Sequence, residues 1–224
     1  MARVVVTGAA SGIGAATAEA FVERGFDVIG MDLDWPSRTD TADGLTAHTI
    51  DVSDVAASTA LLSQFGDIVH LVNAAGVRPQ ASLAMSDHAM ALRCLEVNAL
   101  GAMNVMRVVV NTESPLESVV NVASAAAWGK QNLAVYGASK AALLSLTRTA
   151  ALELASRGVR VNAVLPGTTL TGMLPDGVQA EPAPRNFTGR VMEPKDVGAA
   201  IADVAMLRLT TGATIPIGLL PSSW

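Results

Sequence analysis

Near its N-terminus the chain reads VVVTGAASGIG (residues 4–14), in which three valines are followed by a turn with three glycines. The valines predict a buried strand, and the alanine-rich stretch that begins at Gly12 predicts a helix. Glycines at such a strand-to-helix turn let the backbone approach a pyrophosphate, whose charge the N-terminus of the helix stabilises. Any tight turn between a strand and a helix also favours glycine, so this stretch alone leaves a purely structural interpretation open.

The same alternation of short valine-rich runs and longer alanine- and leucine-rich stretches continues along the chain, which is typical of strand–helix units around a parallel sheet. Strands are predicted near Val4–Thr7, Asp27–Asp32, Ala47–Asp51, Ile68–Asn73, Ser118–Ser124, Val159–Leu165 and Ala213–Ile217. Helices are predicted over Gly12–Glu23, Ser53–Gln64, Ser86–Val110, Tyr136–Arg157 and Pro194–Leu207. We therefore expect an α/β protein: residues 1–224 form a single-domain, doubly wound Rossmann fold, with a mostly parallel seven-stranded sheet and helices on both faces.

Composition excludes several classes of protein. Half of the 224 residues are hydrophobic and 16% are charged, with a net charge of −5 at pH 7, whereas disordered chains and proteins that coat nucleic acid need a high charge density. The single cysteine, Cys94, excludes an internal disulfide, and the three histidines lack metal-ligand spacing. No apolar run approaches the ~20 residues needed to cross a bilayer, and the N-terminal valines are too few for a signal peptide. We expect a cytoplasmic protein with no metal and no nucleic-acid or membrane partner.

Asp32 supports the nucleotide interpretation of the glycine turn. It ends the second predicted strand 18 residues after Gly14, close to the ~20 expected for a carboxylate that accepts hydrogen bonds from ribose hydroxyls. Because a carboxylate there repels a 2′-phosphate, NAD is expected in preference to NADP. Arg38 could favour a phosphate and Asp34 opposes it, and an ordinary solvated acid at a strand end is the alternative.

Tyr136 and Lys140 form a pair that carries acid–base chemistry. Tyr136 is the only tyrosine of the chain, and Lys140 follows four residues later in a predicted helix, so the two side chains share one helix face. An ammonium beside a phenol favours the phenolate and lowers its pKa from ~10 toward neutrality. Ser124 ends another predicted strand, at the sheet edge that faces the ligand crevice in such folds, where its hydroxyl can polarise a substrate oxygen. By itself, a serine in this position is more often an ordinary turn residue.

These motifs together resemble the short-chain dehydrogenase/reductase family. Its TGxxxGxG cofactor turn matches Thr7–Gly14, and its NAG motif matches Asn73–Gly76. Asn98, Ser124, the YxxxK pair Tyr136 and Lys140, and Pro166-Gly167 after Asn162 follow in family order. The resemblance departs at the edges: the stretch between Asp32 and Asp51 leaves little room for the usual helix, and Thr211–Gly218 lacks the usual Asp-Gly-Gly ending.

The resemblance implies a role for each matching residue. Tyr136 would be the acid–base, Lys140 would lower its pKa and hold the nicotinamide ribose, Ser124 would orient the substrate, and Asn98 would hold a water of a proton relay. An ordinary amide on a helix surface is the alternative for Asn98. The residues implied in cofactor binding are Gly8, Ser11, Gly12, Ile13, Gly14, Asp32, Asp51, Val52, Asn73, Ala74, Ala75, Gly76, Tyr136, Lys140, Pro166, Gly167 and Thr169.

The expected function is therefore an NAD(P)-dependent oxidoreductase that interconverts a secondary alcohol and a ketone. A catalytically silent dinucleotide-binding sensor is the alternative, although a sensor has no need of the proton path. Substrate selection is expected in a loop over 167–193 and in the residues after Ser124. The candidates for contact with an apolar substrate are Ala126, Trp128, Leu170, Met173, Leu174, Phe187 and Met192. Arg185 and Arg190 could bind an acidic substrate.

The long predicted helix Ser86–Val110 has apolar residues around more of its circumference than one core stripe needs. The excess suggests a second buried contact. With the family resemblance it implies a homotetramer or homodimer that uses this helix and Tyr136–Arg157. A helix buried wholly inside one subunit is the alternative.

Overall fold

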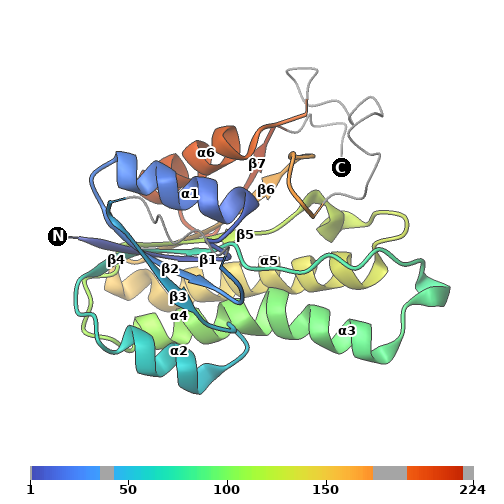
Figure 1. The fold of residues 1–224 in the computed structure, drawn as a ribbon, viewed down its shortest axis with the longest axis horizontal. Coiled ribbons are helices and arrows are strands. Elements are labelled where there is room, and N and C mark those ends of the chain that lie inside the picture. The colour runs from blue at the N-terminus through green and yellow to red at the C-terminus, as the bar shows by residue number, and fades with distance from the viewer. Residues whose placement is uncertain (1, 36–42, 174–190, 219–224) are drawn as a thin grey trace.

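One parallel sheet organises the molecule, which a computed structural model describes over residues 2–35, 43–173 and 191–218 (Figure 1). Within those ranges seven strands pair in the order β3-β2-β1-β4-β5-β6-β7. They are β1 Arg3–Thr7, β2 Asp27–Asp32, β3 Leu45–Thr49, β4 Ile68–Asn73, β5 Ser118–Val122, β6 Arg160–Pro166 and β7 Thr214–Ile217. The order reverses between β1 and β4, and in open parallel sheets such a switch point leaves a crevice at the carboxyl ends of the strands.

Helices cover both faces of the sheet, as Figure 1 shows. One face carries α1 (Gly12–Glu23) and α6 (Pro194–Met206), and the other carries α2 (Val55–Leu62), α3 (His88–Leu95), α4 (Ala102–Val110) and α5 (Ala134–Leu154). Side chains alternate along β1 between these layers: Val4 and Val6 pack with Phe21 of α1, whereas Val5 packs with Val105 of α4. The predicted doubly wound Rossmann architecture is confirmed.

Several predicted elements differ from the structure by one to three residues at their ends, and one predicted helix is interrupted. β3 begins at Leu45 and ends at Thr49, two residues before the predicted Ala47–Asp51, because Leu45 already pairs with Val28 of β2. The predicted helix Ser86–Val110 is interrupted by a π-helical segment, η2 (Glu96–Gly101), between α3 and α4. In the connection between β2 and β3, the described residues 33–35 and 43–44 are not helical; the rest of that stretch lies outside the described residues. In the described part of the chain, every helix is too short or too polar to span a membrane.

Candidate active site

A cleft of about 1000 Å³ opens at the carboxyl ends of the central strands. Every residue predicted for the site lines it except Asn73 and Asn98, which are buried behind its wall. The predicted residues on its surface are Gly8, Ser11, Gly12, Ile13, Gly14, Asp32, Asp51, Val52, Ala74, Ala75, Gly76, Ser124, Tyr136, Lys140, Pro166, Gly167 and Thr169. The fold therefore gathers residues that are up to 161 positions apart in the sequence (Gly8 to Thr169).

The glycine turn after β1 has no room for side chains. Gly8 has a φ of 69°, and a Cβ atom there would lie 2.8 Å from the backbone nitrogen of Ala75. A Cβ atom at Gly14 would lie 1.9 Å from the carbonyl oxygen of Gly8. The hydroxyl of Thr7 fixes the turn by accepting hydrogen bonds from the backbone N–H groups of Ala74 and Ala75, both at 3.1 Å. The result is a bare backbone surface at the N-terminus of α1, which fits the pyrophosphate of a dinucleotide.

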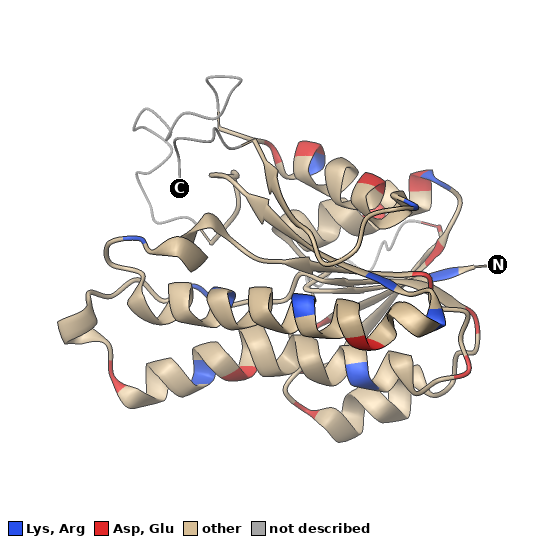
Figure 2. Ribbon diagram, turned by 180° about the vertical axis from the view of Figure 1, so that it is seen from behind, with Lys and Arg blue, Asp and Glu red and all other residues tan. Residues whose placement is uncertain are grey.

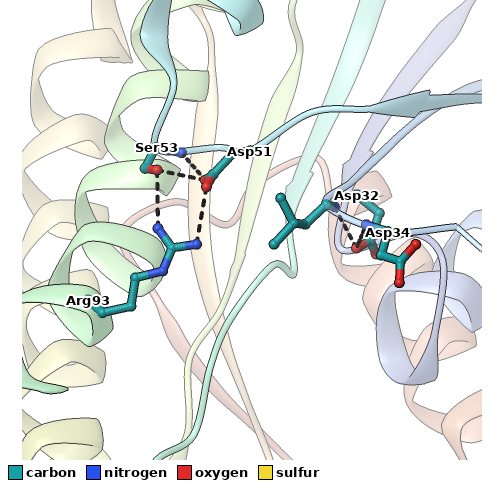
Figure 3. A network of polar contacts seen from close by, with 6 residues as sticks. Asp32, Asp34, Asp51, Ser53 and Arg93 are labelled. Carbon is teal, nitrogen blue, oxygen red and sulfur yellow. Dashed lines mark hydrogen bonds and ion pairs between the residues drawn. The ribbon is translucent and has the colours of Figure 1, made fainter.

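Asp32 ends β2 beside this turn. One of its carboxylate oxygens accepts a hydrogen bond from the backbone N–H of Ala10 at 2.9 Å, and the other accepts one from Leu33 at 2.7 Å. These bonds hold the carboxylate at the cleft, where it can accept hydrogen bonds from ribose hydroxyls. Asp34 also lines this end of the cleft (Figure 3).

A network that the sequence analysis missed holds Asp51 (Figure 3). Arg93 of α3 pairs with its carboxylate at 3.1 Å, and Ser53 donates to the same carboxylate through its backbone N–H and its hydroxyl. Burial raises the pKa of Asp51, but the hydrogen bonds from Ser53 and Arg93 and the charge of Arg93 together bring that pKa below its usual value. Asp51 therefore remains a carboxylate at neutral pH, on the surface of the cleft in which the resemblance implies cofactor binding. Because Arg93 is 42 residues away in sequence, no local pattern indicates this pair.

Tyr136 and Lys140 lie one turn apart on α5 and both line the cleft. Tyr136 is 8% exposed and Lys140 4%. The Lys140 ammonium nitrogen is 5.8 Å from the centre of the Tyr136 ring, and it donates a hydrogen bond to the carbonyl oxygen of Val122 at 2.7 Å. Ser124 follows β5 and also faces the cleft. Three of the four side chains predicted for catalysis, Ser124, Tyr136 and Lys140, thus line one cleft.

The pKa values of this group differ from those expected for Tyr136 and Lys140 as an isolated pair. Burial raises the pKa of the Tyr136 phenol above its usual value, while a hydrogen bond with Ser124 and the charge of Arg78 act in the opposite direction. Burial also lowers the pKa of Lys140 to about 8. In the protein alone, therefore, desolvation outweighs the expected lowering of the phenol pKa by Lys140. A low phenol pKa remains a prediction for the complex with a dinucleotide.

Asn98 lies in the π-helical segment and is 1% exposed, so it is not an amide on a helix surface. Its side chain accepts a hydrogen bond from the backbone N–H of Val77 at 2.8 Å and donates to the carbonyl oxygen of Val77 and to the hydroxyl of Ser139, both at 2.9 Å. Ser139 in turn donates to the carbonyl oxygen of Tyr136. Asn98 thereby ties the segment after β4 to the helix that carries Tyr136 and Lys140, and its role in holding a water remains a prediction.

The side chain of Asn73 is buried, and its hydrogen bond joins elements of the fold. Its amide donates to Asn121 on β5, and the amide of Asn121 donates to Thr147 on α5, both at 2.9 Å. This buried chain joins two central strands to α5 behind the cleft. It supports the position of the following residues, Ala74–Gly76, on the cleft wall.

The part of the cleft around Tyr136, where the substrate is expected, is lined by described residues from three segments. Ala126 and Met173 line it as predicted, together with Leu133 and the unpredicted Arg78. Met192 is buried and pairs with the 168–170 segment through backbone hydrogen bonds, while Trp128 is 46% exposed. Leu170 is partly buried and does not line the cleft. Leu174, Arg185, Phe187 and Arg190 lie outside the described residues.

Comparison with known proteins agrees with this geometry. The model of a family described as short chain dehydrogenase matches residues 2–182. The chain is 39% identical to cis-4-hydroxycyclohexanecarboxylate dehydrogenase of Sinomonas cyclohexanicum, covering 90% of this chain and 88% of that protein. It is 32% identical to 2-keto-3-deoxy-L-fuconate dehydrogenase of Xanthomonas campestris pv. campestris, covering 95% and 77%. A solved structure of 4-hydroxyisoleucine dehydrogenase complexed with NADH is similar over 99% of both chains, with a TM-score of 0.86 and 27% identity. On these matches, the chain belongs to the short-chain dehydrogenase family of oxidoreductases.

Proposed function

We propose that the protein is an NAD-dependent dehydrogenase that interconverts a secondary alcohol and a ketone. The observation that carries this proposal is the convergence of Ser124, Tyr136 and Lys140 at one end of a cleft whose other end holds a bare glycine turn and Asp32. One end can bind a dinucleotide, and the other can move a proton beside it. A purely regulatory dinucleotide-binding protein has no need of the second end.

Ser124, Tyr136 and Lys140 each have a separate role in the proposed reaction. In the direction of oxidation, Ser124 accepts a hydrogen bond from the substrate hydroxyl or donates one to its oxygen, and the Tyr136 phenolate removes the hydroxyl proton. The glycine turn and Asp32 would hold a nicotinamide dinucleotide, which would supply the hydride chemistry in either direction when bound. In reduction, the Tyr136 phenol returns the proton to the carbonyl oxygen. Lys140 stabilises the phenolate and, on release from Val122, can bind the nicotinamide ribose.

Two further parts of the proposal rest on the cleft and the relatives. The carboxylate of Asp32 would repel a 2′-phosphate, which supports NAD over NADP, and the NADH named for the 4-hydroxyisoleucine dehydrogenase structure supports a nicotinamide dinucleotide. The hydroxyl named in cis-4-hydroxycyclohexanecarboxylate stands on a ring carbon and is a secondary alcohol, which supports that reaction class. Substrate selection would fall to the segment that begins at Gly167 and to the residues after Ser124.

The test is a screen of secondary alcohols and ketones with NAD and NADP in parallel, following the absorbance of the reduced nicotinamide. We expect turnover with NAD and weaker use of NADP. Tyr136→Phe should reduce kcat by a factor of about 10² to 10⁴, because it removes the acid–base hydroxyl, whereas NADH should still bind through the glycine turn and Asp32. NADH binding without turnover of any compound would instead favour the regulatory alternative.

A further inference from the structure

Arg78 is a partly buried cation without a partner in the described structure. Among the described arginines of similar burial, Arg3 and Arg93 form ion pairs, and Arg160 donates to backbone carbonyl groups. Arg78 makes no hydrogen bond or ion pair with any described residue. A guanidinium cannot lose its charge at physiological pH, so one that is held partly out of water favours an anion beside it.

The backbone around Arg78 is fixed beside the catalytic group. Val77, the residue before it, is held by Asn98 and packs against the cluster that contains Tyr136. Three residues after it, Ala81 donates a backbone hydrogen bond at 3.0 Å to Asn132, just before α5 begins. Arg78 lines the same cleft as Tyr136, and its charge lowers the pKa of the phenol. The guanidinium thus lies in the same cleft as the acid–base and near enough for its charge to act on the phenol.

Charge is unequally distributed along the cleft. Its described acidic lining residues, Asp32, Asp34 and Asp51, all lie at or just beyond the ends of β2 and β3, at the adenosine end. The described lining of the substrate end carries Arg78, Lys130 and Lys140 and no acid. Lys140 is engaged with Val122, and Lys130 is exposed at the rim. Arg78 is therefore the cation best placed to meet a substrate anion close to the reacting carbon.

We infer that Arg78 binds a carboxylate of the substrate, so that the protein acts on secondary hydroxy acids and the corresponding keto acids. This inference rests on the proposed function and adds the substrate class to it. A single guanidinium matches one carboxylate through two parallel hydrogen bonds, which would orient the acid as well as attract it. Ser124 and Tyr136 would then meet the hydroxyl, and Arg78 would meet the opposite end of the molecule.

The first experiment measures binding without turnover. Cyclohexanecarboxylate and its uncharged analogue cyclohexanecarboxamide are titrated calorimetrically into the protein saturated with NADH. The carboxylate should bind at least about tenfold more tightly than the amide, because hydrogen bonds to charged groups are worth more than neutral ones. Arg78→Gln should abolish this preference, Arg78→Lys should retain part of it, and Lys130→Gln, which removes an equal charge from the rim, should leave it in place.

Three results would overturn the inference. The first is equal affinity of the unmodified protein for the carboxylate and the amide. The second is an equal loss of the carboxylate preference in Lys130→Gln and in Arg78→Gln. The third is that Arg78→Gln weakens NADH binding as much as it weakens carboxylate binding. The last result would assign Arg78 to the dinucleotide phosphates.

Turnover of matched substrates separates this inference from the proposed function. 3-Hydroxybutanoate, 4-hydroxypentanoate and 5-hydroxyhexanoate are each compared with their methyl esters. A preference of about tenfold or more in kcat/KM for an acid over its ester, lost in Arg78→Gln, supports the inference. Turnover of esters and acids alike would overturn the inference and leave the proposed function standing. Carboxylate-selective binding with no turnover of any alcohol or ketone would support Arg78 as an anion site and count against the proposed function.

Discussion

At the scale of single residues, the burial of Tyr136 and its proposed role as acid–base have opposite requirements for the pKa of the phenol. The phenol is buried, which raises its pKa, yet catalysis at neutral pH needs access to the phenolate. Because Tyr136 is the only tyrosine, the ultraviolet absorbance of phenolate reports this one group. We expect it to titrate above ~10 in the protein alone, and well below that value with NAD bound, when Lys140 and the bound dinucleotide surround it. In Lys140→Ala with NAD, the titration should return upward. Identical titrations with and without NAD would contradict this account.

Some residues of the candidate site could be predicted from the sequence, and others could not. The spacing of Tyr136 and Lys140 is local, since four residues make one helix turn, and the glycine turn and Asp32 are also marked by short-range pattern. The partner of Asp51, in contrast, is Arg93, 42 residues further along the chain. Arg78 follows a strand end, which was a usable signal, but its lack of a partner is visible only in three dimensions. Polar partners that are brought together by the fold leave no periodic trace in sequence.

At the scale of elements, hydrophobic pattern predicts the buried strands and helices well and their interruptions poorly. α1, β2 and β4 have the bounds predicted for them, because each has a clear apolar run bounded by glycine or by a charged residue. The π-helical segment within Ser86–Val110 was not predicted; within it, Asn98 donates hydrogen bonds to Val77 and Ser139. These partners belong to other elements, so the period of the helix itself gives no warning.

Contact between α1 and α6 gives a prediction at this scale. A Cβ atom at Gly198 of α6 would lie 2.5 Å from the carbonyl carbon of Ala16 and 2.7 Å from the backbone nitrogen of Thr17, and backbone atoms cannot move aside as a side chain can. Gly198→Ala should therefore destabilise the protein by about 1–3 kcal/mol, although alanine is ordinarily the better helix former. The measurement is the urea concentration at half-unfolding. Gly66→Ala, with open space around its Cβ position, is the matched control and should be neutral or slightly stabilising. Equal stability of the Gly198→Ala variant and the unmodified protein would show that the two helices can separate at little cost.

At the scale of the whole molecule, His70 links stability to pH. It lies in β4, with its Nδ1 atom 2.9 Å from the hydroxyl of Ser118 and its ring 5.9 Å and 5.5 Å from the ring centres of Phe21 and Phe26. Burial lowers its pKa to about 4, with a smaller opposing effect from Glu117. The folded protein therefore keeps His70 neutral while the unfolded chain takes up a proton below ~6.5. Stability from this group is full above that pH and falls as the pH decreases toward 4.

Between pH 7 and pH 5 the loss from His70 should be about 2 kcal/mol, measured as the free energy of unfolding in urea. His70→Gln should lack this part of the pH dependence even if it is less stable at pH 7. His88→Gln, at an exposed position of α3, should keep the full dependence. The same pH slope in His70→Gln and the unmodified protein would assign acid sensitivity to other groups.

The outer surface of α3, α4 and α5 bears on how the whole molecule associates. Leu92 of α3, Leu100 of η2, Met103 of α4 and Leu152 of α5 are 39–81% exposed there. In Figure 2, uncharged segments make up most of the ribbon of these helices, with charged segments between them. Apolar surface of this kind is unfavourable in water and is typical of an interface. We propose that copies of this chain associate through these helices, as a symmetric homodimer or homotetramer.

Light scattering coupled to size-exclusion chromatography tests this association. We expect a mass two or four times the 22.9 kDa of the chain. Leu152→Arg should lower that mass, because burial of an unpaired charge at an interface is costly, and the substitution should not disturb the monomer, since the side chain is 81% exposed. Leu83→Arg, at an equally exposed leucine of η1 (Leu83–Met85), is the matched control and should keep the parental mass. A mass of 22.9 kDa for the unmodified protein, or an unchanged mass for Leu152→Arg, would show that these helices face solvent in the working molecule.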